Sequence, residues 1–183
     1  MTTFGILEGS ARMASLSRAV ARSAQSLAPE GVTCRVLPNP VGLPQYNQDV
    51  LDAGIPAPVA ALAAELAICD AVLIVTPEYN WSIPGSLKNA IDWLSRLKPN
   101  PLEGKPVAIW TVSPGQLGGA RVHEGLRHVL HSQDMRVMAK PEVQLGLAAG
   151  KVDVAASAVT DEASRNFLRD HLAKFETFVS AHR

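Results

Sequence analysis

Cysteine and unbalanced charge are both scarce in this sequence. Its two cysteines, Cys34 and Cys69, lie far apart, outside any Cys-x-x-Cys pattern and among apolar neighbours. Two such residues cannot build a disulfide framework, so we expect buried thiols in a reducing compartment rather than catalytic cysteines. Lysine and arginine together number 17, as do aspartate and glutamate. This balance argues against nucleic-acid or anionic-membrane partners and against an acidic docking surface.

Long hydrophobic runs and a targeting segment are also missing. No stretch approaches the roughly 20 apolar residues that span a bilayer. The start, "MTTFGILEGS", has neither the basic segment nor the apolar run of a signal peptide, which predicts a cytoplasmic protein without a membrane partner. Because 47% of the residues are hydrophobic and 19% are charged, the composition is globular, and we expect residues 1–183 to form one domain.

Apolar runs alternate with amphipathic stretches along the chain, a pattern typical of a parallel sheet covered by helices. Short apolar runs predict strands at residues 2–8, 31–37, 70–76, 105–112 and 135–139. Apolar residues at helical spacing predict helices over residues 16–27, 56–69, 84–94, 122–130 and 167–175. We therefore predict an α/β fold with five parallel strands and helices on both faces.

Capping chemistry predicts some element boundaries. Pro84 suits the first position of a helix, with Ser82 as its N-cap, and Thr160 or Asp161 suits the cap of the last helix. Residues 38–58 are rich in proline and predict a long rim loop at the site. The segment between the fifth strand and the last helix has no regular pattern.

Three specialised loops leave strand ends that a parallel sheet brings to one edge, where such folds bind ligands. The first is "EGSARMASLSRAV", whose turn-forming and polar residues include Gly9, Ser10, Arg12, Ser15 and Ser17. Hydroxyls, a guanidinium and a helix N-terminus together can hold a phosphate, although helix capping by Ser15 explains the serine equally well. The absence of a P-loop or GxGxxG pattern disfavours a nucleoside triphosphate or a Rossmann-type dinucleotide.

The second loop, "VTPEYNWSIPGSLKNAIDW", follows the most apolar strand. Its aromatic residues Tyr79 and Trp81 could flank a planar ring, although packing beneath the loop explains each of them alone. Lys88 and Asp92 are four apart on the following helix and predict a surface ion pair.

The third loop, "TVSPGQLGGARVHEG", has Ser113 and three glycines, Gly115, Gly118 and Gly119, that would let its backbone approach a ligand closely. Together the three loops describe a site for one phosphate and one flat ring with a polar edge. Flavin mononucleotide (FMN) has this shape.

The segments "GSARMASLSR", "TPEYNWSIPGSLKNAIDWLSR" and "SPGQLGG", with the rim segment "LPQYNQD", resemble the NADPH-dependent FMN reductase family of flavodoxin-like proteins. Members of that family include quinone, chromate and azo-dye reductases. The resemblance runs in register from about Phe4 to Gly119. It implies a flavodoxin-like sheet of five parallel strands in the order 2-1-3-4-5. Ser17 stands where the family often has asparagine, which shortens one hydrogen-bonding group.

The resemblance also implies the roles of individual residues. Around the FMN phosphate it places Ser10, Arg12, Ser15, Leu16 and Ser17. Along the isoalloxazine and ribityl side it places Pro77, Glu78, Tyr79 and Asn80, and against the ring from the third loop it places Ser113 and Gly115. The family is usually dimeric, so the resemblance implies a homodimer and leaves a tetramer of paired dimers open.

The implied activity is hydride transfer from NADPH or NADH to bound FMN, and then to a small-molecule electron acceptor, in a ping-pong scheme. Acceptors of the family are quinones, free flavin, azo compounds and metal oxyanions. No catalytic side chain and no metal is expected, because the HExxH spacing is absent and His123, His128 and His131 are predicted to be structural or surface residues of a helix.

Other functions remain open on the sequence. A flavodoxin-type electron carrier and a flavin-binding protein without nicotinamide turnover would share the fold, although Arg12 and the balanced charge disfavour the carrier. A receiver-type signalling domain would need clustered acids that Glu8 and Glu78 do not provide.

Overall fold

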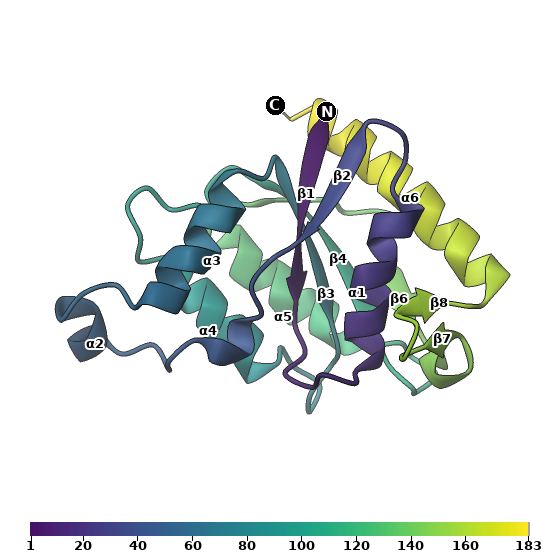
Figure 1. Cartoon of the computed structure of the whole chain (residues 1–183), viewed down its shortest axis with the longest axis horizontal. Coiled ribbons are helices and arrows are strands. Elements are labelled where there is room, and N and C mark those ends of the chain that lie inside the picture. Colours follow the sequence, from purple (N-terminus) through teal and green to yellow (C-terminus); the bar gives the residue numbers. More distant parts are fainter. Residues whose placement is uncertain (183) are drawn as a thin grey trace.

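A parallel sheet with helices on both faces forms the centre of the computed structural model, which describes residues 1–182 (Figure 1). The strands are β1 (Thr2–Glu8), β2 (Val32–Val36), β3 (Ala71–Thr76), β4 (Pro106–Val112), β5 (Arg136–Val137) and β6 (Val143–Leu145). The order is β2-β1-β3-β4-β5, with β6 also paired to β4, and every pairing in this sheet is parallel. The predicted flavodoxin-like fold and strand order are therefore confirmed.

The edge beyond β4 differs from the prediction. The expected strand at residues 135–139 pairs only through Arg136 and Val137, opposite the start of β4, and β6 then pairs with the end of β4. Pro141 lies between the two segments. Because proline has no N–H to donate to a sheet ladder, a continuous strand through this position is disfavoured. Two short strands therefore share the edge that one was expected to fill.

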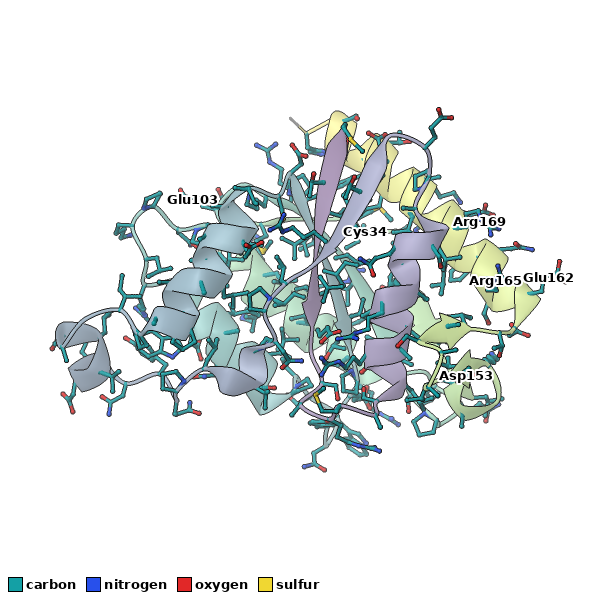
Figure 2. The ribbon with its side chains drawn as sticks, in the orientation of Figure 1. Cys34, Glu103, Asp153, Glu162, Arg165 and Arg169 are labelled. Atoms are coloured by element: carbon teal, nitrogen blue, oxygen red, sulfur yellow. The ribbon has the colours of Figure 1, made fainter. Side chains whose placement is uncertain are left out.

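Helices cover each face of the sheet and create two separate cores. Helices α1 (Leu16–Leu27) and α6 (Glu162–Ser180) pack on one face, in a core that includes Phe4 and Phe175. Helices α3 (Ala57–Ala67), α4 (Gly85–Leu94) and α5 (Ala120–His131) pack on the other face, in a core that includes Trp93. Every residue of β3 and β4 is buried, as expected for central strands covered on both sides. On the outer side of α6, Glu162, Arg165 and Arg169 are exposed (Figure 2).

Helix starts agree in part with the capping predictions. Asp161 caps α6 by accepting a hydrogen bond from Ser164 N, and Ser15 caps α1 by accepting one from Arg18 N. The start of α4 was predicted wrongly: Pro84 is its N-cap rather than its first residue, and Ser82 does not cap it. Ser82 instead exchanges two backbone hydrogen bonds with Tyr79, which places it in a turn before the helix.

The rim segment is ordered by α4. It contains a 3₁₀ turn, η1 (Pro40–Gly42), and the short helix α2 (Gln48–Asp52). Asn89 accepts a hydrogen bond from Tyr46 N (2.7 Å) and donates one to Pro44 O (2.9 Å), and Trp93 Nε1 donates to the same oxygen (2.7 Å). The asparagine and tryptophan of the motif "LKNAIDW" therefore hold the rim in place.

The segment without a predicted pattern forms a small hairpin. It comprises a 3₁₀ turn, η2 (Ala148–Gly150), and two antiparallel strands, β7 (Val152–Asp153) and β8 (Ala158–Val159). Both strands contact α1, and Figure 2 labels Asp153 on this hairpin. Among residues 1–182, the helices are each too short or too polar to cross a membrane.

Candidate functional site

A pocket of about 320 Å³ lies at the carboxyl edge of the sheet, within the range of roughly 300–1,000 Å³ that is usual for small-molecule sites. All three predicted loops contribute to it. The predicted site residues that line it are Ser10, Arg12, Ser15, Leu16, Ser17, Pro77, Glu78, Tyr79 and Ser113. Asn80 and Gly115 are the two predicted residues that lie outside this lining.

The first loop presents buried hydroxyls at the N-terminus of α1. Ser15 Oγ accepts a hydrogen bond from Arg18 N (3.2 Å) and lies 2.9 Å from Ser17 Oγ. Ser15 is therefore a helix cap, as one interpretation predicted, and it also lines the pocket. Its role in holding a phosphate stays a prediction. Gly9 is required by close approach, because a Cβ atom at this residue would lie 2.3 Å from Thr76 Oγ1.

Arg12 is the available cation of this pocket. Its guanidinium donates to Ala14 O (3.3 Å), and within residues 1–182 it forms no ion pair. The first turn of α1 contains no acidic residue. An unpaired guanidinium beside a helix N-terminus, with its partial positive charge and unpaired N–H groups, attracts an anion. The loop therefore fits the phosphate of a mononucleotide.

Glu78 lines the pocket, but its carboxylate faces another helix. Glu78 Oε2 accepts a hydrogen bond from Val122 N in the first turn of α5 (3.0 Å), and Oε1 lies 3.9 Å from Arg121 Nη1. The N-cap residue of α5 is Gly119, which has no side chain to cap it. Glu78 therefore supplies the missing cap from a different loop, and only the rest of this residue faces the pocket.

The tip of the second loop is a two-residue turn. Tyr79 and Ser82 exchange backbone hydrogen bonds of 3.1 and 2.9 Å, and the residues between them, Asn80 and Trp81, have φ angles of 49° and 63°. Positive φ at both central positions is the geometry of a type I′ turn. Trp81 is 71% exposed and Arg121 lies over its ring at 4.7 Å. Packing beneath the loop, the alternative interpretation of Trp81, is therefore wrong.

Two of the three glycines in the third loop, Gly118 and Gly119, are required by the packing of the chain. Gly118 has a φ of 62°, and a Cβ atom there would lie 2.7 Å from Gly146 N. Gly119 has a φ of 86°, and its Cβ would lie 3.0 Å from Thr111 Cβ. Both glycines are buried against protein, so the prediction that they open the backbone to a ligand is wrong for these two positions. Gly115 is exposed and donates its N–H to Ser113 Oγ (3.0 Å).

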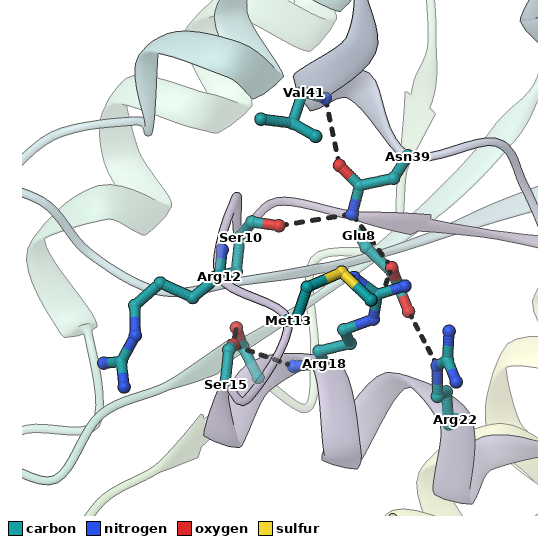
Figure 3. A network of polar contacts seen from close by, with 10 residues as sticks. Glu8, Ser10, Arg12, Met13, Ser15, Arg18, Arg22, Asn39 and Val41 are labelled. Atoms are coloured by element: carbon teal, nitrogen blue, oxygen red, sulfur yellow. Dashed lines mark hydrogen bonds and ion pairs between the residues drawn. The ribbon is translucent and has the colours of Figure 1, made fainter.

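Two features of the site were missed from the sequence. Val154, in the β7–β8 hairpin, lines the pocket, and its irregular segment carried no signal that would have predicted this. Glu8 is buried beside the first loop, in contact with Arg18, Arg22 and Asn39 (Figure 3). An acid at the end of an apolar strand, followed by two arginines four apart on a helix, was a signal that could have indicated the pairing.

The histidines are placed as the sequence predicted, away from the pocket. His123 is buried, with Nε2 3.2 Å from both Thr111 Oγ1 and Val143 O. Burial lowers its pKa below the usual value, so the neutral ring is favoured. His128 and His131 are exposed on α5.

The fold and the pocket together define a flavodoxin-like protein whose first loop suits a mononucleotide phosphate. The NADPH-dependent FMN reductase family matches residues 2–150, and the chain belongs to that family. It is therefore an oxidoreductase that uses FMN with NAD(P)H as co-substrate.

Named relatives support this membership. The chain is 45% identical over 174 residues to a quinone reductase of Escherichia coli (strain K12), covering 94% of this chain and 93% of the relative. It is 37% identical over 173 residues to an NAD(P)H-dependent FMN reductase of Pseudomonas aeruginosa, covering 94% and 92%. Among solved structures, it matches FerB, a flavoenzyme NAD(P)H:(acceptor) oxidoreductase from Paracoccus denitrificans, with a TM-score of 0.89, 35% identity and coverage of 100% and 99%.

Proposed function

We propose that this chain is an NAD(P)H:quinone oxidoreductase that holds FMN in the pocket at the carboxyl edge of its sheet and works by a ping-pong scheme. The observation that carries the proposal is the geometry of one pocket, which joins an unpaired guanidinium and a helix N-terminus to a wall that includes Tyr79. The names of the quinone reductases at 45% and 38% identity support quinones as acceptors. Free flavin, azo compounds and metal oxyanions are further candidates.

When bound, FMN would supply the redox chemistry, which is hydride transfer from a nicotinamide. In our proposal the residues of this chain bind and orient it. Ser10, Arg12, Ser15, Leu16 and Ser17 receive the phosphate, and the exposed Arg12 supplies the charge. Pro77, Glu78, Tyr79 and Asn80 bound the ring and ribityl side, with Ser113 and Gly115 opposite. Of these residues, Asn80 and Gly115 lie outside the lining of the pocket.

Among the described residues, the one carboxylate that lines the pocket is already engaged by the protein, which supports a reaction carried by the cofactor. Within the described chain, the one carboxylate of the lining, Glu78, accepts from the α5 backbone, and His123 lies in the core. The residues of this chain would then hold the FMN and orient the nicotinamide and the acceptor, which in our proposal use the same side of the pocket in turn. A shared side requires the first product to leave before the acceptor binds.

The decisive experiment combines a spectrum with steady-state kinetics. Purified protein is expected to show flavin absorption, and anaerobic NADPH or NADH is expected to bleach it. With a benzoquinone as acceptor, initial rates at several fixed acceptor concentrations should give parallel double-reciprocal lines. Intersecting lines would exclude the ping-pong scheme. A flavin that the nicotinamides do not reduce would favour an electron carrier instead.

We also propose a homodimer with the ring side of the pocket near the subunit boundary. Apolar side chains are exposed on or next to two of the loops that form the pocket: Tyr79 and Trp81 on the second loop, with Leu117 on the third and Leu147 beside it. Leu147 N donates to Gly115 O (3.1 Å), which joins these last two segments. Exposed apolar residues gathered in one region are typical of interfaces. Light scattering should give twice the chain mass of 19.5 kDa; a monomer would contradict this.

A cytoplasmic location is the remaining part of the proposal. Cys34 and Cys69 are both buried as free thiols, and burial raises the pKa of Cys34 to about 12, which keeps the thiol protonated and unreactive. Unpaired thiols are typical of a reducing compartment. Fractionation of the source cells with an antibody against the chain tests this location.

A further inference from the structure

Glu8 is a buried carboxylate that no part of the proposed function uses. It ends β1, and its side chain is 1% exposed. Its oxygens lie 3.4 Å from Arg18 Nε and 3.3 Å from Arg22 Nε, both on α1, and accept a 3.0 Å hydrogen bond from Asn39 Nδ2 (Figure 3). A buried charge is tolerated only with such partners. Glu8 therefore joins β1, α1 and the rim segment behind the first loop.

Asn39 connects Glu8 to the pocket. Its amide nitrogen donates to Glu8 Oε2 and also to Ser10 O (3.2 Å), while its Oδ1 accepts from Val41 N (2.9 Å). Both hydrogens of the amide are thus used, and the Glu8 carboxylate, the Ser10 carbonyl and the Val41 N–H together fix which way the amide is turned. Ser10 lines the pocket, and its Oγ accepts from Arg12 N (3.2 Å). A continuous series of contacts therefore runs from Glu8 to Arg12.

Arg18 provides a second connection to the same loop. Its backbone N–H donates to the capping Ser15 Oγ (3.2 Å), and its Nη1 lies 2.9 Å from Met13 Sδ. With Glu8 holding Nε, the guanidinium remains against the loop, where its side chain is only 12% exposed. The loop is thus supported at Ser10 through Asn39 and at Met13 through Arg18.

We propose that Glu8 is a positioning residue for the FMN phosphate: through Asn39 and Arg18 it holds Ser10 and Arg12 in the arrangement that receives the anion. This inference rests on the proposed function, because it takes the first loop as the phosphate site. A pre-ordered loop loses little conformational freedom on binding, which favours affinity.

An opposing electrostatic effect has to be weighed. Removing the negative charge of Glu8 would leave two arginines unopposed near the phosphate, and by itself this would strengthen anion binding. Without Glu8, however, Arg18 and Arg22 repel each other, and Arg22 is already 43% exposed. Charges that turn toward water are screened. The loss of order at Ser10 and Arg12 is therefore the larger effect.

The test compares FMN with riboflavin, which has the same ring and no phosphate. We expect Glu8→Gln to weaken FMN binding by about tenfold, the order of one net hydrogen bond, and to leave riboflavin binding almost unchanged. Flavin fluorescence titrations of the apoprotein give both affinities. A role in folding alone would lower both affinities together. The ratio of the FMN affinity to the riboflavin affinity, called the ratio below, therefore isolates the positioning role.

Two further variants keep the test independent of the folding of Glu8→Gln. Asn39→Ala removes the donor to Ser10 O and should lower the ratio in the same direction. Glu65→Gln is a control for the same chemical change at a more exposed position. It removes the carboxylate of the Arg35–Glu65 ion pair, which lies outside the pocket, and should keep the wild-type ratio. In an Arg12→Ala background, Glu8→Gln should change the ratio little, because both act on one contact.

The outcomes separate the two proposals. A wild-type ratio retained in both Glu8→Gln and Asn39→Ala would overturn this inference and leave the proposed function standing. A ratio that rises in Glu8→Gln would also overturn it, since the electrostatic effect would then be the larger. A wild-type protein that binds FMN no better than riboflavin would remove the proposed phosphate site and this inference with it.

Discussion

At the scale of single residues, some polar side chains of the pocket already form hydrogen bonds within the protein, and others do so only weakly. The carboxylate of Glu78 accepts from the α5 backbone, and the hydroxyls of Ser10 and Ser113 accept from N–H groups of their own loops. The guanidinium of Arg12 has one weak contact, to Ala14 O at 3.3 Å. A serine hydroxyl that accepts a hydrogen bond can still donate its O–H, so a ligand meets these hydroxyls and one charged donor, the guanidinium of Arg12.

Replacing Arg12 with alanine is expected to weaken FMN binding by about 1.5–3 kcal/mol, the usual value of a hydrogen bond to a charged group. Riboflavin binding should stay within about twofold, because riboflavin has no phosphate. Equilibrium titration at low and at high salt measures both, and the loss should shrink as salt screens the pair. Arg169→Ala, on the exposed side of α6, is the control. FMN affinity equal to the wild type at both salt concentrations would contradict the assignment of Arg12.

Two glycines allow a matched comparison of backbone requirements. Gly118→Ala should destabilise the protein by about 2–4 kcal/mol, because it combines a left-handed φ of 62° with an overlap against Gly146 N. Gly125→Ala should stabilise it by about 0.5–1 kcal/mol, since Gly125 lies within α5 with open space at its Cβ position. Urea unfolding of the two variants gives both signs. If both variants had the same free energy of unfolding as the wild type, neither position would depend on its glycine.

At the scale of elements, α4 carries two kinds of residue from one motif. Its inner residues Asn89 and Trp93 hold the rim segment by three hydrogen bonds of 2.7–2.9 Å. Its outer residues Lys88 and Asp92 form the predicted ion pair, with a nitrogen–oxygen distance of 2.6 Å. Asn39, at the start of the same rim segment, donates a hydrogen bond to Glu8 beside the first loop. The rim segment therefore connects α4 to the first loop.

Asn89→Ala is expected to loosen the rim and to cost about 1–3 kcal/mol, because Tyr46 N loses its acceptor. Limited proteolysis should show faster cleavage near the rim, and denaturant unfolding should give the free-energy loss. Lys88→Ala, one position away on the same helix, removes a part-exposed ion pair worth about 0.3–0.5 kcal/mol and serves as control. If both variants are cleaved at the wild-type rate, the rim does not depend on Asn89.

At the scale of the whole molecule, a buried hydrogen bond connects the last helix to the middle of the sheet. Trp110 Nε1 on β4 donates to His171 Nδ1 on α6 (3.0 Å), and both side chains are buried. Burial lowers the pKa of His171 from 6.5 to about 4. Since the indole can donate only to an unprotonated nitrogen, the docking of α6 on the sheet requires a neutral histidine.

The free energy of unfolding should therefore decrease as the pH is lowered from about 6.5 to about 4. In this interval the unfolded chain binds a proton at His171 and the folded protein does not, so stability is complete above the unfolded pKa and is lost as pH falls through the interval. The difference between the two pKa values corresponds to about 3 kcal/mol at most. Urea unfolding at several pH values measures the slope, and His171→Phe should flatten it. A variant with the wild-type slope would assign the effect to other groups, such as His123, whose pKa is also lowered.

What the sequence determined by itself was local. The apolar run of β3 predicts a strand buried on both faces, and the spacing of Leu87, Ala90 and Ile91 predicts the helix α4. Ser15 predicts the cap of a different helix, α1. Each of these predictions depends on neighbours a few residues away. The loop motifs were likewise enough to collect most of the pocket residues, since parallel strands bring their carboxyl ends to one edge.

Only the tertiary structure decided which residues far apart in the sequence contact one another. Glu78 caps α5 across 44 positions, Asn39 reaches Glu8 across 31, and Gly118 is required by a backbone that arrives from residue 146. Such pairings follow from how strands register and helices pack over the entire chain. No local pattern encodes them, because the energy of a buried contact depends on both partners and on the water that their burial excludes.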